Sequence, residues 1–450
     1  MEEDKCFDNC GIVGLYSSKP CAESLWNGIF RLQHRGQQYC GLATYEEDLA
    51  LITHEGYVRH TFTPEELTQL KGNFGIGHVS LKERQPILLN SKLGKFAIAF
   101  SGNIMNADEL IARLKPKDKT FSRDTQLELI ARPITTQIEL IARLIAEGQD
   151  FVDGIEKMSR TIKGSYALVI LTPKSIYAAR GPYGFKPLIL GRNENNFCVA
   201  SESRVFDILG MKIERDVQPG EIVLINEKGF ETKKKLKSKR RGRCAFEWGY
   251  IASMDSIIDG IPVVRARKNL GASLARRDKV KADIVSPIPF SGIGYALGYH
   301  EASGIPYDES FFLDRFATRS YTPLEQSQRD EIARIKLSVV GETVRGKRII
   351  LCDDSIVRGT QMRAQVSKLK KAGAKEVHVR VGCPPLMAPC KYGISTRSYE
   401  ELAAKKYSLD GIRKLIGADS LKYNTIEDFV KAIGLPADEL CLACWTGKYF

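Results

Sequence analysis

Hydrophobic and polar positions follow two different rhythms along this 450-residue chain. Up to about Glu231, short apolar runs are bounded by Gly, Asn, Pro or charged residues, which is the pattern of β-strands, and two longer stretches have helical spacing. The expected strands are Gly11–Tyr16, Phe96–Phe100, Ser165–Leu171 and Glu221–Ile225, and the expected helices lie near Ala22–Gln33 and Gln126–Ile145. This strand-rich mixture predicts an α+β sandwich.

The second half alternates strand, loop and helix. Apolar runs predict strands at Ala282–Ile288, Arg348–Cys352 and Glu376–Val381, and helical spacing predicts helices at Tyr295–Ala302 and Gln361–Ala372. In the last helix Met362, Val366 and Leu369 share one face, and Gly373 is suited to end it. This order is typical of an α/β domain with a parallel sheet, so the domain boundary is expected near residues 232–243.

Chain length and hydropathy limit the class of protein. A chain of 450 residues is expected to form two or three domains. Its longest apolar runs, such as Tyr166–Leu171, are far shorter than the roughly 20 residues that span a bilayer. The acidic start, Met1–Lys5, is not a signal peptide. We therefore expect a cytoplasmic protein without a membrane partner.

The net charge of +13 favours an anionic partner, either nucleic acid or a small polyphosphate. One basic run stands out, Lys233–Arg243, but it lies between the two structured halves and has no interleaved aromatic residues. A solvated linker therefore explains the run better than a nucleic-acid patch, and we expect no nucleic-acid partner.

The strongest local pattern is Ile349–Thr360, an apolar strand that ends in two acids and continues through a loop into a helix. Ligands of parallel sheets bind beyond the carboxyl ends of strands, where backbone N–H groups bind phosphate. Asp353 and Asp354 suit ribose hydroxyls. The residues that suit a phosphate-binding turn are Ser355, Gly359 and Thr360.

Eleven cysteines are many for a cytoplasmic chain, in which disulfides are rare. Five of them lie in apolar or strand-like settings and are expected in the core: Cys21, Cys40, Cys198, Cys352 and Cys383. Cys441 and Cys444 form a CxxC motif, which alone leaves zinc, redox chemistry and an iron–sulfur cluster open.

The acidic strand end resembles the signature of type I phosphoribosyltransferases, and its form, DDSIVRGT, is that of the amidophosphoribosyltransferases. Further motifs of that family follow in order along nearly the whole chain: CGIVG at 10–14, LQHRGQ at 32–37, GIGHV at 75–79, SES at 201–203, RDVQPGEI at 215–222, CAFE at 244–247, SPIP at 286–289, SGIPY at 303–307, GAKEVHVR at 373–380 and CPP at 383–385. The resemblance implies a class II glutamine amidotransferase-like domain over residues 10–235, with an N-terminal nucleophile hydrolase-like α+β sandwich. A type I phosphoribosyltransferase domain with a cluster-binding tail would follow over 236–450.

The same resemblance implies the reaction and the amidotransferase residues. In this family ammonia, released from glutamine or supplied free, attacks phosphoribosyl pyrophosphate and gives 5-phosphoribosylamine, the first step of purine biosynthesis. Cys10 matches the nucleophile, exposed when a propeptide, here residues 1–9, is removed. Gly102 could supply a backbone donor to the oxyanion, and Asp124 matches the acid that binds the amino group of glutamine.

In the transferase half, the resemblance implies substrate-binding residues in the loop and its surroundings. Asp353, Asp354 and Ser291 would bind Mg²⁺, and one branch of the family binds a structural [4Fe–4S] cluster through four cysteines. The matching positions for substrate are Asp353, Asp354, Ser355, Ile356, Val357, Arg358, Gly359, Thr360, Ser291, Arg315 and Arg319, and those for the cluster are Cys244, Cys390, Cys441 and Cys444. Purine nucleotide effectors and a homo-oligomer are further expectations.

Four positions depart from the family, one of them Phe290, an aromatic residue where many members carry an acid. Ser80 replaces the arginine that binds the carboxylate of glutamine, and the loop after it is shortened; Ser101 replaces the asparagine of the oxyanion hole; Leu313 replaces a lysine near the pyrophosphate. Losing one oxyanion donor typically costs 10²–10³-fold in rate. Two alternatives to the family reaction therefore remain: a divergent paralogue that uses free ammonia or another amine, and a non-catalytic nucleotide-binding regulator.

Overall fold

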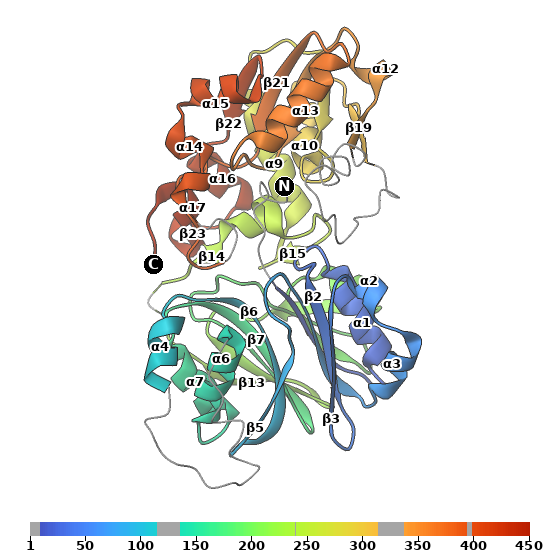
Figure 1. Ribbon diagram of the computed structural model, residues 1–450, viewed down its shortest axis with the longest axis vertical. Coiled ribbons are helices and arrows are strands. Elements are labelled where there is room, and N and C mark those ends of the chain that lie inside the picture. Colours follow the sequence, from blue (N-terminus) through green and yellow to red (C-terminus); the bar gives the residue numbers. More distant parts are fainter. Residues whose placement is uncertain (1–9, 115–135, 239, 314–336, 394–397) are drawn as a thin grey trace.

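The first domain is a sandwich of two antiparallel sheets with helices on both outer faces (Figure 1). This computed structural model describes residues 10–114, 136–238, 240–313, 337–393 and 398–450. The seven-stranded sheet, in the order β11-β9-β10-β1-β4-β2-β3, comprises β1 Gly11–Tyr16, β2 Tyr39–Tyr45, β3 Leu49–Glu55, β4 Phe74–Ser80, β9 Ile189–Arg192, β10 Phe197–Ala200 and β11 Lys212–Asp216. The six-stranded sheet, in the order β13-β12-β8-β7-β6-β5, comprises β5 Ile87–Ser91, β6 Gly94–Ile104, β7 Gly164–Thr172, β8 Ser175–Arg180, β12 Glu221–Asn226 and β13 Gly229–Lys235.

Strand alternation explains the layers, because successive side chains point to opposite faces. Ile12 lies in the core between the sheets, whereas its neighbour Val13 packs beneath the first helix. The helices on the first sheet are α1 Ala22–Arg31, α2 Val58–Thr61, α3 Pro64–Gln69 and α8 Arg204–Ile208, and those near the second are α4 Ala107–Leu114, α6 Gln137–Ala146 and α7 Phe151–Thr161. The predicted strands and first helix are confirmed. The predicted helix at 126–145 is confirmed as α6, and the first part of its range lies outside the described residues.

The second domain, above the sandwich in Figure 1, has a four-stranded parallel sheet in the order β17-β20-β21-β22. Its strands are β17 Ile284–Pro287, β20 Arg348–Asp353, β21 Glu376–Val381 and β22 Ser420–Tyr423. One face packs on α9 Val263–Arg276, α10 Ile293–Ser303 and α16 Ile426–Ile433, and the other on α13 Thr360–Lys371 and α15 Leu409–Ile416. The predicted α/β order is therefore confirmed, including the buried face of α13.

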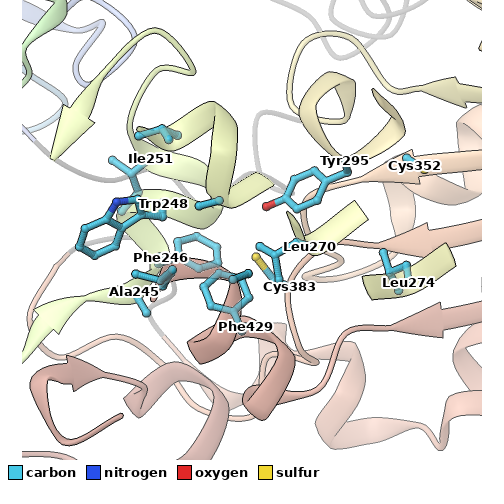
Figure 2. Packing of buried hydrophobic residues seen from close by; sticks show 14 of the residues in the cluster. Ala245, Phe246, Trp248, Ile251, Leu270, Leu274, Tyr295, Cys352, Cys383 and Phe429 are labelled. Carbon is cyan, nitrogen blue, oxygen red and sulfur yellow. The ribbon is translucent and has the colours of Figure 1, made fainter. Parts of the chain in front are cut away.

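Figure 2 shows the core on the first of these faces, where Leu270, Tyr295 and Phe429 meet Cys383. The Tyr295 hydroxyl donates to the Gly249 carbonyl at 2.6 Å, so the short π-helix Glu247–Ile251 is fixed to this core. The remaining short elements of this domain are β14 Arg243–Cys244, β15 Ile257–Ile258, β16 Ile261–Pro262, β18 Phe311–Leu313, β19 Leu337–Val339, α12 Gly341–Val344, α14 Ala403–Lys406, β23 Leu440–Cys441 and α17 Ala443–Thr446, with 3-10 turns at Tyr399–Glu401 and Ala437–Glu439.

The core cysteines and the basic run lie in ordinary structural settings. All five cysteines assigned to the core are buried: Cys21, Cys40, Cys198, Cys352 and Cys383. The start of the basic run lies in β13, where Lys233 pairs with Glu231 at 2.9 Å, and its end pairs through Arg243 with Glu439 at 2.5 Å. Among the described residues, we find no helix of the length and apolarity needed to cross a membrane.

Candidate functional site

The acidic strand end lies at the carboxyl edge of the parallel sheet, directly after β20. Asp353 Oδ1 accepts from the backbone N–H of Asp354 at 2.9 Å and from the Ser291 hydroxyl at 2.7 Å. Ser291 reaches this position because Gly292 packs on the end of β20: a Cβ at Gly292 would stand 2.2 Å from the carbonyl oxygen of Cys352. The structure therefore brings Ser291, Asp353 and Asp354 together, as the sequence predicts.

Two buried side chains anchor the loop that follows. Ile356 packs on the α13 face of the sheet and Val357 on the opposite face, so of these two residues only the backbone can face a ligand. Gly359 has a φ of 86° and occupies the N-cap of α13, a conformation that glycine adopts without strain. Thr360, the first residue of α13, is exposed. The loop thus presents backbone N–H groups and a hydroxyl at a helix N-terminus, which suits a phosphate.

Electrostatics distinguish this edge from an ordinary strand end. Burial raises the pKa of Asp353 well above its usual range, and the neighbouring carboxylate of Asp354 raises it further. Burial also raises the pKa of Asp354, although Ser355 and Arg267 partly oppose this. Two neighbouring carboxyl groups with raised pKa values are suited to bind hydroxyl groups or a divalent cation.

The loop arginine is already engaged. Arg358 donates from Nη2 to Glu401 at 3.1 Å, and both side chains are partly buried. Arg358 therefore fixes the loop to the 3-10 turn that starts at Tyr399. Arg315 and Arg319 lie outside the described residues, in the segment between β18 and β19.

The predicted nucleophile, Cys10, precedes β1 and is partly buried. Cys10 directly precedes β1, and Gly102 lies on β6. These two strands lie close together, because Ile12 of β1 and Ala99 of β6 belong to the same core between the sheets. Position 102 must be glycine because there is no room for a side chain: a Cβ there would stand 2.0 Å from the Ser165 carbonyl oxygen.

The neighbouring Ser101 is 2% exposed, and its hydroxyl has no hydrogen-bond partner in the described structure. Asp124 lies outside the described residues.

A buried ion network beside Cys10 joins the two domains. Arg35 donates to Glu202 at 2.6 Å and to Glu247, at the start of the π-helix, at 2.8 Å. Its Nε lies 3.5 Å from the carbonyl oxygen of Cys10. Burial alone would raise the pKa of Glu202, but His34 and Arg35 lower it below its usual range. Sequence reasoning missed this network, and its only signal was a charged residue inside the LQHRGQ motif.

The four cysteines assigned to a cluster come from three segments that meet beside the sandwich. The parallel pair β14–β23 places Cys244 opposite Cys441. The backbone carbonyl of Cys444 accepts from Met387 at 2.8 Å and from Ala388 at 3.1 Å, just before Cys390. Burial raises the pKa of Cys441 to about 12, and Cys390 raises it as well. Burial also raises the pKa of Cys244, while Lys186 lowers it.

The cysteine segment also touches the strand that carries Gly102. Asn103 donates to the carbonyl of Lys391 at 2.9 Å, and the Ser165 hydroxyl donates to the carbonyl of Tyr392. Phe450 packs against Phe185 in a T-shaped arrangement, with 5.2 Å between the two ring centroids. The predicted ligand segments therefore lie between the two domains, as the C mark in Figure 1 shows for the tail.

The chain thus joins an antiparallel sandwich with a cysteine before its first strand to a parallel-sheet domain with an acidic loop at its carboxyl edge. The sequence-family model described as glutamine amidotransferase domain matches residues 75–207 of this chain. The amidophosphoribosyltransferase of Archaeoglobus fulgidus is 39% identical over 452 residues, covering 98% of this chain and 97% of the relative. That of Methanocaldococcus jannaschii is 40% identical over 466 residues, covering 98% and 97%.

Solved structures agree. The glutamine phosphoribosylpyrophosphate amidotransferase of Bacillus subtilis, complexed with ADP and GMP, is 37% identical and superposes with a TM-score of 0.89 over 98% of this chain and 97% of that one. The chain belongs to the amidophosphoribosyltransferase family. Its sandwich is an N-terminal nucleophile hydrolase-like fold, and its second domain is a type I phosphoribosyltransferase fold.

Proposed function

We propose that this chain forms 5-phosphoribosylamine and pyrophosphate from phosphoribosyl pyrophosphate and ammonia, the first step of purine biosynthesis. The observation that carries the proposal is the loop Asp353–Thr360, with Ser291 hydrogen-bonded to it, in a chain that matches its family over nearly its whole length. A non-catalytic regulator is disfavoured, because this loop keeps each of the polar groups that the reaction needs.

The residues of the loop would act by positioning and charge. Asp353 and Asp354 accept hydrogen bonds from the ribose hydroxyls, while the backbone N–H groups before α13 bind the 5-phosphate. The amine nitrogen then forms its bond to C1 as the C1–oxygen bond breaks, pyrophosphate leaves with the electron pair, and the nitrogen loses a proton. The paired carboxyl groups with raised pKa values and the Ser291 hydroxyl fit Mg²⁺, which would neutralise charge on the pyrophosphate.

The direct test is release of pyrophosphate from phosphoribosyl pyrophosphate with an ammonium salt at a pH where ammonia is available. We expect release that depends on both reactants. A purified, folded protein that binds phosphoribosyl pyrophosphate but releases no pyrophosphate with ammonia or glutamine would favour the non-catalytic regulator.

The amine donor is a second question, and the amidotransferase pocket favours free ammonia. Ser80 is fully buried, and its hydroxyl donates to the carbonyl of Glu83 at 2.6 Å, so it closes a turn and cannot replace a cation. The nearby Arg84 pairs with Glu55 at 3.6 Å on the surface. Ser101 offers a shorter side chain than the family asparagine. We therefore propose a divergent member whose ammonia-dependent activity exceeds its glutamine-dependent activity.

We also propose that Cys244, Cys390, Cys441 and Cys444 bind a structural [4Fe–4S] cluster. The described residues contain no group of three or more His, Cys, Asp or Glu side chains spaced to bind a single metal ion. A cluster is larger than one ion and separates its ligands further, and four thiolates are its usual ligand set. The cysteines converge from separate segments beside the buried cation Lys186, which would favour their thiolate forms. The bound cluster would tie the tail to both domains.

Regulation and location remain proposals of the same kind. The Bacillus subtilis relative was solved with ADP and GMP, and we propose that purine nucleotides also bind this chain. We propose a cytoplasmic homo-oligomer. Light scattering with and without nucleotide would measure the mass, and a monomer under both conditions would contradict the oligomer.

A further inference from the structure

We infer that the tip of the β15–β16 hairpin is a pH-sensitive latch between the two domains, and that Asp216 of the sandwich is the group that switches it. The hairpin belongs to the second domain, and its loop, Asp259–Gly260, lies against Asp216 at the end of β11. The inference goes beyond the proposed reaction, because neither residue takes part in that reaction.

The local sequence explains the shape of the hairpin tip. Ile258 pairs with Ile261, so the loop between the two strands has two residues. Asp259 and Gly260 have φ values of 47° and 75°, and Asp-Gly is a favoured sequence for two-residue hairpin loops with positive φ at both positions. Both the carboxylate and the backbone N–H of Asp259 have partners in the sandwich.

Two arginines lie at the Asp259 carboxylate. Arg180, at the end of β8, donates to both of its oxygens at 2.9 Å, and Arg243 of β14 lies 3.1 Å from one of them. The three side chains are buried, with exposed fractions of 1% for Arg180, 5% for Asp259 and 8% for Arg243. This bidentate pair fixes the tip, because loss of either partner would leave a buried charge without compensation.

Asp216 adds a second carboxyl group to the joint. Its Oδ1 accepts from the backbone N–H of Asp259 at 2.8 Å, so it binds the hairpin tip directly. Burial and the neighbouring carboxylate of Asp259 raise the pKa of Asp216 to about 6, although Arg180 opposes this. Burial also acts on Asp259, but Arg180 and Arg243 hold its pKa below its usual range. The two acids therefore differ in charge when the pH is below about 6.

The neighbouring acids have cations of their own. On the same strand as Asp216, Arg215 pairs with Glu221 at 2.8 Å, and beyond the hairpin Arg243 pairs with Glu439 at 2.5 Å. Burial disfavours the ionised form of both glutamates, but these arginines hold their pKa values below the usual range. Asp216 is therefore the acid at this joint that is suited to change its charge between pH 5 and 7.

Ionisation of Asp216 weakens the latch. A carboxyl group with a pKa of about 6 in the docked chain and near 3.9 in the undocked chain stabilises docking fully at low pH. Its contribution is lost as the pH rises through the docked value, and two pKa units correspond to about 100-fold in the docking equilibrium. The hairpin continues into α9, whose Arg267 donates to the carbonyls of Trp248 and Tyr250, so the latch lies next to the π-helix in the chain and in space.

The test is hydrogen exchange of the backbone amides of residues 256–262 in the full-length protein, measured by mass spectrometry and divided by the intrinsic rate at each pH. In wild type we expect protection to fall at least about tenfold between pH 5 and 7.5. In Asp216→Asn, which keeps shape and an acceptor oxygen but cannot ionise, it should change less than about twofold. Asp255→Asn is the matched control, an exposed carboxylate of the same segment that pairs with Arg31, and it should keep the wild-type pH dependence.

Wild-type protection that stays constant between pH 5 and 7.5 would overturn the inference. An equal fall in wild type and Asp216→Asn would also overturn it, because another group would then be the switch. Asp259→Asn, which loses the charge that Arg180 binds, should lower protection at both pH values, and unchanged protection would show that this pair does not hold the tip. Thermal unfolding identifies a folding defect, and if Asp216→Asn does not fold, the wild-type pH course and Asp259→Asn carry the test.

Discussion

The parallel-sheet domain and the sandwich differ in how the polar groups at their candidate sites are arranged. At the carboxyl edge of the parallel sheet, Asp353 and Asp354 lie side by side with raised pKa values and face a loop of backbone donors. In the sandwich, Ser80 and Glu83 bind each other and the start of α6. The first arrangement is costly unless a ligand is bound, whereas in the second the Ser80 hydroxyl and one carboxylate oxygen of Glu83 already have hydrogen-bond partners within the protein. The contrast fits the proposal that the loop after β20 binds a ligand, whereas the turn after β4 is held by hydrogen bonds within the protein.

The largest expected effect is loss of activity when the acidic loop of the parallel-sheet domain is changed. Asp353→Ala should lower ammonia-dependent pyrophosphate release by at least about 100-fold, because the ribose hydroxyls lose an acceptor and the cation a ligand. The fold should persist, since removing one of two neighbouring carboxylates relieves repulsion. Calorimetry should show lost binding of phosphoribosyl pyrophosphate. Unchanged binding in this variant and in Thr360→Ala would show that the site lies elsewhere.

The second effect concerns the C-terminal tail, which carries Cys441 and Cys444 and lies between the two domains. Protein purified without oxygen should be brown, with about four irons and four sulfides per chain, because four thiolates are the usual ligand set of such a cluster. Cys441→Ser should lose the colour and lower the temperature of unfolding. The control variant Cys198→Ser, which changes a core cysteine, should contain as much iron as the wild-type protein. Colourless wild-type protein with stoichiometric zinc would contradict the cluster.

The third effect tests the network that joins the ends. Arg35→Met should lower the free energy of unfolding by about 3–5 kcal/mol, because Glu202 and Glu247 stay buried without their partner. The exposed pair Arg31–Asp255 provides the control, and Arg31→Ala should cost less than roughly 1 kcal/mol. Chemical denaturation measures both. Equal effects of the two substitutions would show that the buried network does not stabilise the domain contact.

The same network predicts a pH dependence. The pKa of Glu202 is lower in the folded chain than in the unfolded chain, so its contribution to stability is present above the unfolded pKa, near 4.3, and is lost as the pH falls through the folded value. Arg35→Met removes one cause of the lowered pKa. The difference in stability between wild type and variant should therefore shrink as the pH falls below about 4. A constant difference would argue against this linkage.

The smallest effect sharpens the comparison at the sandwich end. Wild-type protein should use ammonia at least roughly tenfold more efficiently than glutamine, because it lacks the arginine and one oxyanion donor. Restoring both in Ser80→Arg with Ser101→Asn should raise glutamine use only partly, since the shortened loop after residue 80 remains. Equal efficiency with both donors in wild type would show that another group binds the carboxylate.

Local sequence patterns predicted the second domain well because its elements are close in sequence. The strand β20, the loop and α13 follow one another, so the acidic strand end, the turn and the buried face of the helix could be predicted together. The predictions for Ile356 and Val357 were less specific, because alternation alone does not say that both side chains anchor the loop from opposite faces. Arg358, likewise, depends on Glu401 from a distant turn.

The amidotransferase pocket was harder to predict because its contacts join distant segments. Glu83 meets Gln137 across the strands between them, and no periodicity reports such a contact. A further signal was present in the sequence: residues 125–132, TQLELIAR, recur almost unchanged as 136–143, TQIELIAR. The second copy forms α6, with Thr136 as its N-cap. The sequence alone could not decide which copy starts the helix beside the pocket, and Asp124, before the first copy, stays a prediction.

The pairing of β14 with β23 has a consequence for how the chain is made. Cys244 opens the second domain and Cys441 lies near its far end, yet the two are neighbours in a parallel ladder. Such a contact closes a loop almost as long as the domain, and loop-closure entropy makes long-range pairings slow to form. During synthesis the sandwich and most of the parallel sheet can assemble first, whereas this pairing must wait until residue 441 has emerged. The joint between the domains is therefore expected to be the last part of the protein to fold.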